Sequence, residues 1–277
     1  MIRLIAIDID GTLLDSRYQL PPANVEALRH AHRRGIEIVL VTGRRHSFAL
    51  PIARALGVDP CIISSNGAIT RTMEGETFHR DLMPAAATRQ LCAHMDDFRG
   101  NMVITFDREG KGALALEGLE QLSRSISRWL ETNHECIEVV RPIEESLARG
   151  HDPVQAMFCG DLARMQHAAR RLAAGTVMEH ITLLRTEYPA RDLYILDVMN
   201  RCCSKGHALE RWAKARAISA SEVAAIGDNH NDVQMLNFAG RAFIMGNACD
   251  ELKQNGWTLA PSNDADGVAA AVEQVLD

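Results

Sequence analysis

Aromatic residues and long apolar runs are both scarce in this sequence. Phe, Trp and Tyr make up 5% of its 277 residues, and no apolar run approaches the roughly 18 residues that span a bilayer. The first residues lead directly into LIAIDID, without the basic and apolar segments of a secretory leader. Basic residues are not in excess, because 30 Lys and Arg stand against 36 Asp and Glu. A nucleic-acid-binding face needs concentrated positive charge, so we expect a soluble, cytoplasmic protein with neither nucleic acid nor a membrane as partner.

Cysteines are few and lack the spacing of a metal or disulfide framework. The seven cysteines include no C-x-x-C pair, and their number is odd. This pattern predicts reduced thiols in a cytosolic protein. The adjacent Cys202 and Cys203 are either packed thiols or a redox pair, and the sequence leaves that choice open.

Short apolar runs alternate with helical patterns at both ends of the chain. This alternation predicts a parallel sheet with helices on both faces. The expected strands lie at 3–9, 36–41, 61–64, 193–199, 222–226 and 241–245. The expected helices lie at 22–34, at a segment ending near Gly57, and at 204–216, 231–238 and 266–276.

The middle of the chain follows a different rhythm. Residues 68–82 indicate a hairpin around Glu74-Gly75. From Pro84 to about Ala190, helices alternate with strands that tight turns connect, which predicts an antiparallel sheet with helices on one side. We therefore expect an α/β core formed by 1–82 and 193–277, with 83–192 inserted as a second, α+β domain.

The first predicted strand ends in a pair of carboxylates. Asp8 and Asp10 alternate with Ile7 and Ile9, so both acidic side chains leave the strand on the same side. In a parallel sheet, ligands bind beyond the carboxyl ends of the strands. Two neighbouring carboxylates repel each other and are costly to bury without a cation or a proton. Alone, the pair is equally compatible with a solvated turn.

A second acidic segment, Gly227-Asp228-Asn229-His230-Asn231-Asp232, follows the strand expected at 222–226. Asp228 would lie at the same sheet edge as Asp8 and Asp10, and Asn231 and Asp232 would lie at the start of the next helix. Oxygen ligands without paired His or Cys favour a hard cation, above all Mg²⁺. An acidic helix N-cap is the alternative interpretation.

Two further turns carry groups that suit an anion. Thr42-Gly43-Arg44 follows the strand at 36–41 and offers a hydroxyl and a backbone N–H. Ser204-Lys205-Gly206 opens a helix, where a lysine faces the positive end of the helix dipole. This arrangement is mildly unfavourable, and an anion bound there would relieve it. Each turn alone is also typical of ordinary surface structure. Because all four segments follow predicted strands, we expect them to meet in one crevice as a phosphoryl-transfer site.

These residues resemble the haloacid dehalogenase (HAD) superfamily. The resemblance rests on DIDGT at 8–12, VTGR at 41–44, SKG at 204–206 and GDNHND at 227–232. The turn Ser65-Asn66-Gly67 and the long insertion are similar to the Cof-type subgroup, whose members carry a C2B cap. The resemblance implies a Rossmann-like core, an inserted α+β cap that sets specificity, and a Mg²⁺-dependent phosphatase. The implied substrate is a small phosphorylated metabolite, such as a sugar phosphate or a cofactor- or nucleotide-like phosphate.

The resemblance also implies roles for individual residues. Asp8 is the expected nucleophile that forms an aspartyl-phosphate, and Asp10 is the expected general acid and base. The implied metal ligands are Asp8, Asp10 through its backbone carbonyl, Asp228, and Asp232 as a supporting residue. The implied phosphate- and substrate-binding residues are Thr42, Gly43, Arg44, Asn66, Lys205 and Asn231.

Other functions remain open at this stage. A phosphotransferase or phosphomutase would use the same Asp8 intermediate with a sugar acceptor. A receiver-like signalling domain also combines a phospho-accepting Asp with Mg²⁺, a hydroxyl and a lysine, and a silent metabolite-binding protein would keep only the fold. The sequence ranks none of the candidate cap residues His151, Asp152, Arg185 and Glu187, and it leaves the substrate and the oligomeric state open.

Overall fold

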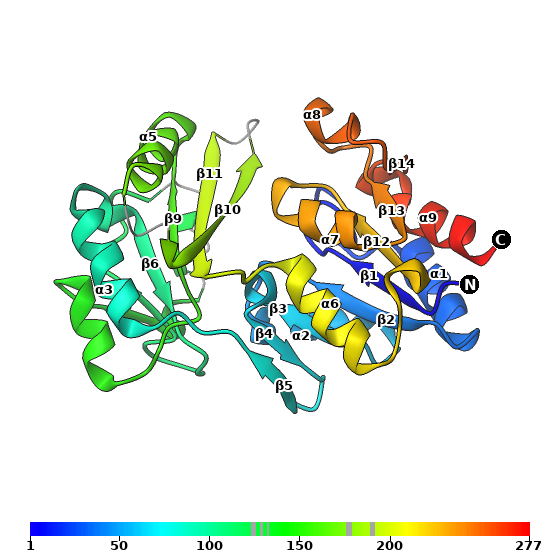
Figure 1. Ribbon diagram of the computed structural model, residues 1–277, viewed down its shortest axis with the longest axis horizontal. Coiled ribbons are helices and arrows are strands. Elements are labelled where there is room, and N and C mark those ends of the chain that lie inside the picture. The colour runs from blue at the N-terminus through cyan, green and yellow to red at the C-terminus, as the bar shows by residue number, and fades with distance from the viewer. Residues whose placement is uncertain (123–125, 128–129, 132, 176–178, 189–191) are drawn as a thin grey trace. The chain divides into compact units, whose positions relative to one another are not determined.

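A computed structural model describes residues 1–122, 126–127, 130–131, 133–175, 179–188 and 192–277. The chain forms two compact units (Figure 1). The first contains Met1–Arg80 and Ser204–Asp277, and the second contains Asp81–Cys203. An inserted second unit agrees with the sequence, although its limits differ from those expected.

The first unit contains a sheet of eight strands in the order β14-β13-β12-β1-β2-β3-β4-β5. Its strands are β1 (Leu4–Ile7), β2 (Glu37–Val41), β3 (Cys61–Ser64), β4 (Ile69–Arg71), β5 (Thr77–Arg80), β12 (Val223–Gly227), β13 (Arg241–Ile244) and β14 (Thr258–Leu259). The pairs from β14 to β3 are parallel, whereas β4 and β5 form the antiparallel hairpin expected near Glu74. The mixed α/β fold predicted from the alternating pattern is confirmed.

Helices cover both faces of this sheet because the strands are apolar on both sides. In β1, Ile5 and Ile7 pack into one core cluster, and Leu4 and Ala6 pack into another on the opposite face. The first cluster includes residues of α1 (Pro22–Arg33), α2 (His46–Leu56) and α9 (Gly267–Leu276). The second includes residues of α6 (Lys205–Ala215), α7 (Val233–Phe238) and α8 (Asp250–Lys253). The strand β14 and the short helix α8 were not predicted.

The described residues of the second unit form a sheet of six strands in the order β10-β11-β9-β6-β7-β8. Its strands are β6 (Met102–Thr105), β7 (Leu114–Leu116), β8 (Ile137–Val139), β9 (Gln155–Gly160), β10 (Ile181–Tyr188) and β11 (Leu193–Asn200). Side chains of α3 (Ala85–His94) and α5 (Leu162–Ala173) pack with this sheet in a single cluster. The pairs are antiparallel as expected, except that β7 and β8 run parallel.

The strand expected at 193–199 forms, but its expected place in the core sheet is wrong. As β11, it pairs antiparallel with β10 and β9 in the second unit. The first unit therefore resumes at Ser204, not at residue 193, and its first part ends at Arg80, not at residue 82. An apolar run predicts a buried strand but does not show which strands will pair with it. Ala190, near which the middle elements were expected to end, lies outside the described residues.

Within the described ranges, no helix combines the length and apolar character that crossing a membrane requires. The cytoplasmic location stays a prediction.

Candidate active site

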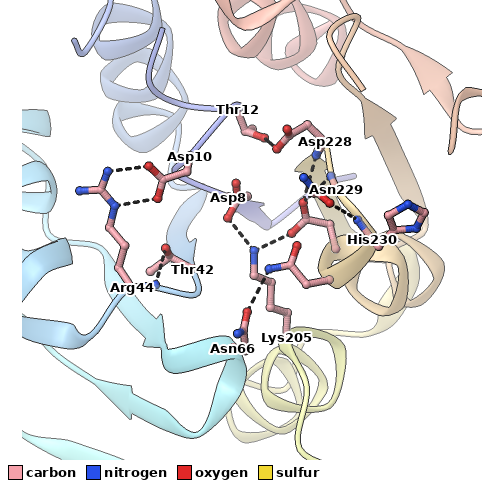
Figure 2. Close-up of polar contacts among 12 residues, drawn as sticks. Asp8, Asp10, Thr12, Thr42, Arg44, Asn66, Lys205, Asp228, Asn229 and His230 are labelled. Atoms are coloured by element: carbon pink, nitrogen blue, oxygen red, sulfur yellow. Dashed lines mark hydrogen bonds and ion pairs between the residues drawn. The ribbon is translucent and has the colours of Figure 1, made fainter. Parts of the chain in front are cut away.

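Three neighbouring strands of the first unit end in polar residues at the same edge of the sheet. The strands β12, β1 and β2 lie side by side and run parallel, so their carboxyl ends coincide. Asp8 follows β1, Thr42 follows β2, and Asp228 follows β12. All three side chains are buried. The structure therefore brings together the acidic and hydroxyl groups predicted for a common site (Figure 2).

Lys205 also lies at this site, but the structural feature that positions it differs from the one expected. The apolar run at 193–199 predicts a core strand before its helix, but that strand belongs to the second unit. Close packing against Gly67 fixes the start of α6. Gly67 has a φ of +104°, and a Cβ on this residue would lie 2.2 Å from the carbonyl oxygen of Ser204. The Ser204 side chain caps the helix by accepting from the backbone N–H of His207. Lys205 thus enters the site through helix packing.

A buried ammonium group links two carboxylates at the centre of the site. Lys205 Nζ donates to Asp8 Oδ1 at 2.6 Å and to Asp232 Oδ1 at 2.7 Å. Lys205 is 1% exposed and Asp232 is 0% exposed, so bulk water does not screen these contacts. Asp232 Oδ2 accepts from the backbone N–H groups of Asp228 and Asn229. Asp232 therefore holds both Lys205 and the loop that carries Asp228.

The electrostatics of the site show a shortage of positive charge. Asp8, Asp228 and Asp232 each offer an oxygen within 4.8 Å of the others. Burial raises the pKa of Asp8 to about 7, and Asp232 and Asp10 add to this rise while Lys205 opposes it. Burial and the charges of Asp8 and Asp232 also raise the pKa of Asp228 well above its ordinary value. Burial by itself would lower the pKa of Lys205, but Asp232 and Asp8 outweigh it and the pKa lies above its usual value.

The donor set fits a hard divalent cation. The cluster offers only carboxylate oxygens, which Mg²⁺ prefers over nitrogen and sulfur. Among the described residues, Asp8 Oδ2 receives no hydrogen bond, while Asp228 Oδ1 accepts from Thr12 Oγ1 at 2.9 Å. A dication beside Asp8 and Asp228 would favour their ionised forms and supply the missing positive charge. Both oxygens of Asp232 already accept hydrogen bonds, which suits the supporting role expected for it.

Asp10 and Arg44 form an ion pair that no sequence pattern indicates. Arg44 Nε and Nη2 donate to the two carboxylate oxygens of Asp10 at 2.7 and 2.6 Å (Figure 2). Both side chains are about a quarter exposed. A bidentate pair of this kind fixes the position of both partners. Asp10 and Arg44 do lie at the site, but in this structure their pairing engages both Asp10 oxygens and two of the Arg44 nitrogens.

The remaining predicted residues make contacts with one another on the loops after β2, β3 and β12. Thr42 Oγ1 accepts from the backbone N–H of Arg44 at 3.1 Å. Asn231 Nδ2 donates to Asn66 Oδ1 at 3.0 Å, which connects the loops after β12 and β3. Gly43 lies against Asn66, since a Cβ there would come within 3.2 Å of the Asn66 amide oxygen. These residues are brought together as expected, and their roles toward a substrate stay predictions.

Thr12 and Asn247 also contact the site, although neither was among the residues predicted for it. Thr12 bonds Asp228, and Asn247 donates to the carbonyl oxygen of Gly11 at 2.9 Å. Asn247 Nδ2 also lies 3.4 Å from Asp228 Oδ2. Asn247 shortly follows β13, the next parallel strand, so the rule that identified Asp8 and Asp228 would also have identified it.

The candidate cap residues lie in the second unit. The Asp152 carboxylate accepts from the backbone N–H of Ala85 at 2.8 Å and so caps the start of α3. Arg185 Nε lies 4.0 Å from Glu187 Oε1. His151 is exposed. Their part in substrate choice stays a prediction.

The raised pKa of Asp8 predicts how stability depends on pH in metal-free protein. Between about pH 4 and 7, the folded state keeps a proton on Asp8 that the unfolded state has lost. The Asp8 contribution to the free energy of unfolding should therefore decrease as the pH rises through this range. We expect Mg²⁺ to bind the ionised carboxylates and therefore to stabilise the protein more at pH 8 than at pH 5.

Urea unfolding at both pH values, with and without Mg²⁺, measures both effects. The variant Asp8→Asn should show a smaller loss of stability with rising pH than the wild type. Equal stabilisation by Mg²⁺ at pH 5 and pH 8 would contradict metal binding by these carboxylates. An unchanged pH dependence in Asp8→Asn would contradict the raised pKa of Asp8.

Known proteins are similar to this chain over nearly its whole length. The family model described as haloacid dehalogenase-like hydrolase matches residues 5–272. The chain is 30% identical to phosphatase YwpJ of Bacillus subtilis, over 99% of this chain and 100% of that protein. It is also 30% identical to pyridoxal phosphate phosphatase YbhA of Escherichia coli, over 96% of each chain.

Solved structures show the same fold. A haloacid dehalogenase-like hydrolase from B. subtilis superposes with a TM-score of 0.82 at 27% sequence identity. The match covers 99% of this chain and 100% of that one. Both the core and the inserted unit therefore have counterparts in that protein.

Proposed function

Because the chain belongs to the haloacid dehalogenase-like hydrolase family, we propose that it hydrolyses phosphate monoesters of small metabolites with Mg²⁺ through a phosphoaspartate at Asp8. The observation that carries this proposal is the contact of Lys205 Nζ with Asp8 Oδ1, at the sheet edge where Asp228 and Thr42 also lie. Such a set of groups suits phosphoryl transfer, which depends mainly on positioning and on charge stabilisation.

In the first step, a carboxylate oxygen of Asp8 attacks phosphorus. An oxygen–phosphorus bond forms to Asp8 while the bond from phosphorus to the leaving oxygen breaks. Lys205 holds Oδ1 of Asp8 in place, and Oδ2 accepts no hydrogen bond from the described residues. Asp10 donates a proton to the leaving oxygen, so the product leaves as an alcohol. For this, the Asp10 carboxyl group must first separate from Arg44, which occupies both of its oxygens.

In the second step, water attacks the phosphorus of the phosphoaspartate. Asp10, now ionised, takes the proton of that water, and the bond between phosphorus and Asp8 breaks. Inorganic phosphate leaves, and Asp8 and Asp10 return to their starting protonation states. The same carboxyl group thus serves as acid in one step and as base in the other.

The metal and the phosphate each have a defined set of partners in this proposal. Asp8, Asp228 and the backbone carbonyl of Asp10 would hold Mg²⁺, with Asp232 in support. When bound, Mg²⁺ neutralises charge on the transferring phosphoryl oxygens. Thr42, Lys205 and Asn231 would donate hydrogen bonds to those oxygens. Arg44, once it releases Asp10, would become available to a phosphate or to the leaving group.

A panel of phosphorylated metabolites tests the activity and narrows the substrate class. The panel should include pyridoxal 5′-phosphate, sugar phosphates and nucleotide-like phosphates, since a relative at 30% identity is a pyridoxal phosphate phosphatase. We expect Mg²⁺-dependent release of inorganic phosphate from several members. Phosphate that moves to an added sugar acceptor without release would instead identify a phosphotransferase.

Metal exchange should change the activity strongly. Removal of divalent cations by a chelator is expected to lower turnover at least about 100-fold, because the buried carboxylates then lack their counter-charge. Addition of Ca²⁺ in the presence of Mg²⁺ is expected to inhibit, since its larger and looser coordination shell misplaces the reacting groups. Initial rates of aryl phosphate hydrolysis give both results. Full activity in chelator after dialysis would contradict the metal assignment.

A further inference from the structure

A second group of metal-ligating side chains lies on the loops that follow β12 and β13. His230, Cys249 and Glu251 place one ligand atom each within 4.8 Å of one another. His230 comes from the turn after β12, and Cys249 and Glu251 come from the start of α8. His230 is partly exposed, and the other two side chains are exposed.

We propose that His230, Cys249 and Glu251 form a binding site for Zn²⁺ or a similar transition-metal dication. Imidazole, thiolate and carboxylate together are the ligands of zinc, whereas Mg²⁺ prefers oxygen alone. In tetrahedral zinc coordination, sulfur and nitrogen ligands lie about 3.5 Å apart. His230 Nε2 and Cys249 Sγ are 3.9 Å apart, so small rotations of exposed side chains bring them into range. Three protein ligands leave the fourth position to water or to another ligand.

This site is separate from the acidic cluster. The His230 ring points away from Asp8 and Lys205 (Figure 2). The two groups share no residue, because the cluster at the sheet edge consists of Asp8, Asp228 and Asp232. The donor types also differ, so each group selects a different class of cation.

The three proposed ligands lie on the two loops, after β12 and after β13, whose residues also support Asp228. On the β12 side, Asn229, which precedes His230, donates its backbone N–H to Asp232 Oδ2. On the β13 side, Asn247, two residues before Cys249, contacts both Gly11 and Asp228. A metal ion held by His230 and Cys249 would therefore connect the two segments that border the acidic cluster.

Cobalt titration in the presence of saturating Mg²⁺ tests the proposal. Co²⁺ takes zinc-type ligands, and a cobalt–thiolate bond gives a charge-transfer absorption that carboxylate ligands cannot produce. We expect one equivalent of Co²⁺ to bind with this absorption, and Zn²⁺ to displace it. Cys249→Ser should abolish the absorption, while His230→Gln and Glu251→Gln should each weaken binding at least about ten-fold.

Cys202→Ser is the matched control, because Cys202 is an exposed cysteine outside the trio. It should keep the absorption and the affinity of the wild type. Absorption that persists in Cys249→Ser, absorption that disappears in Cys202→Ser, or cobalt binding without a thiolate band would overturn the proposal. Should Cys249→Ser fail to fold, unchanged affinity in His230→Gln and Glu251→Gln would overturn it equally.

Discussion

The substitution Asp8→Asn is expected to lower kcat at least about 10⁴-fold while the protein stays folded. An amide cannot act as the attacking carboxylate, and no phosphoaspartate can form on it. The fold should survive for two reasons. The substitution removes one negative charge from a cluster of three acidic groups, which lowers their mutual repulsion, and Lys205 keeps its contact with Asp232. Phosphate release from an aryl phosphate measures the effect, and far-UV circular dichroism checks the fold.

Asp59→Asn is the matched control for Asp8→Asn. Asp59 is an exposed aspartate of the same unit and has no place in the site. It should keep the wild-type rate. Turnover of Asp8→Asn within ten-fold of the wild type would rule out covalent catalysis by this residue.

The substitution Lys205→Met is expected to reduce both stability and activity. Methionine fills a similar volume but leaves Asp8 and Asp232 without the ammonium group that both contact. Breaking a buried ion pair by removing one partner typically costs about 3–5 kcal/mol. The loss should be smaller at pH 5 than at pH 8, because protonation can then relieve the unpaired Asp8. Urea unfolding at both pH values measures it, and aryl phosphate hydrolysis should fall at least about 10³-fold.

A double-mutant cycle separates the charge effect from lost packing. Lys205→Met combined with Asp232→Asn removes one of the stranded carboxylates and should recover part of the lost stability. Lys214→Met, an exposed lysine on the same helix, should change stability by no more than about 0.5 kcal/mol. A Lys205→Met variant as stable as the Lys214→Met control would show that the buried ion pair does not hold the site together.

Much of the site was predictable because parallel strands end at a common edge. The apolar runs before Asp8, Thr42 and Asp228 identified three strands of one sheet, and their order in the structure places them side by side. The residue types after each strand then indicated the chemistry. Asn247 obeys the same rule, but no carboxylate or lysine next to it in that turn drew attention to it.

Other features depend on contacts that the sequence does not specify. The strand 193–199 is apolar enough for either sheet, and only its partners β9 and β10 assign it to the second unit. Lys205 reached the site although the strand expected before it lies elsewhere, since packing of Gly67 against Ser204 sets the start of α6. The pairing of Arg44 with Asp10 joins two residues 34 positions apart, and no local pattern encodes it.

Rapid-quench trapping of the phosphoenzyme tests the central claim most directly. The wild-type protein, mixed with Mg²⁺ and a radiolabelled phosphate monoester, is quenched in acid within one turnover and digested. We predict label on the peptide that contains Asp8, stable in acid and released by hydroxylamine, with formation and decay no slower than kcat. Release of labelled phosphate with no labelled peptide, or label on a peptide without Asp8, would contradict the account.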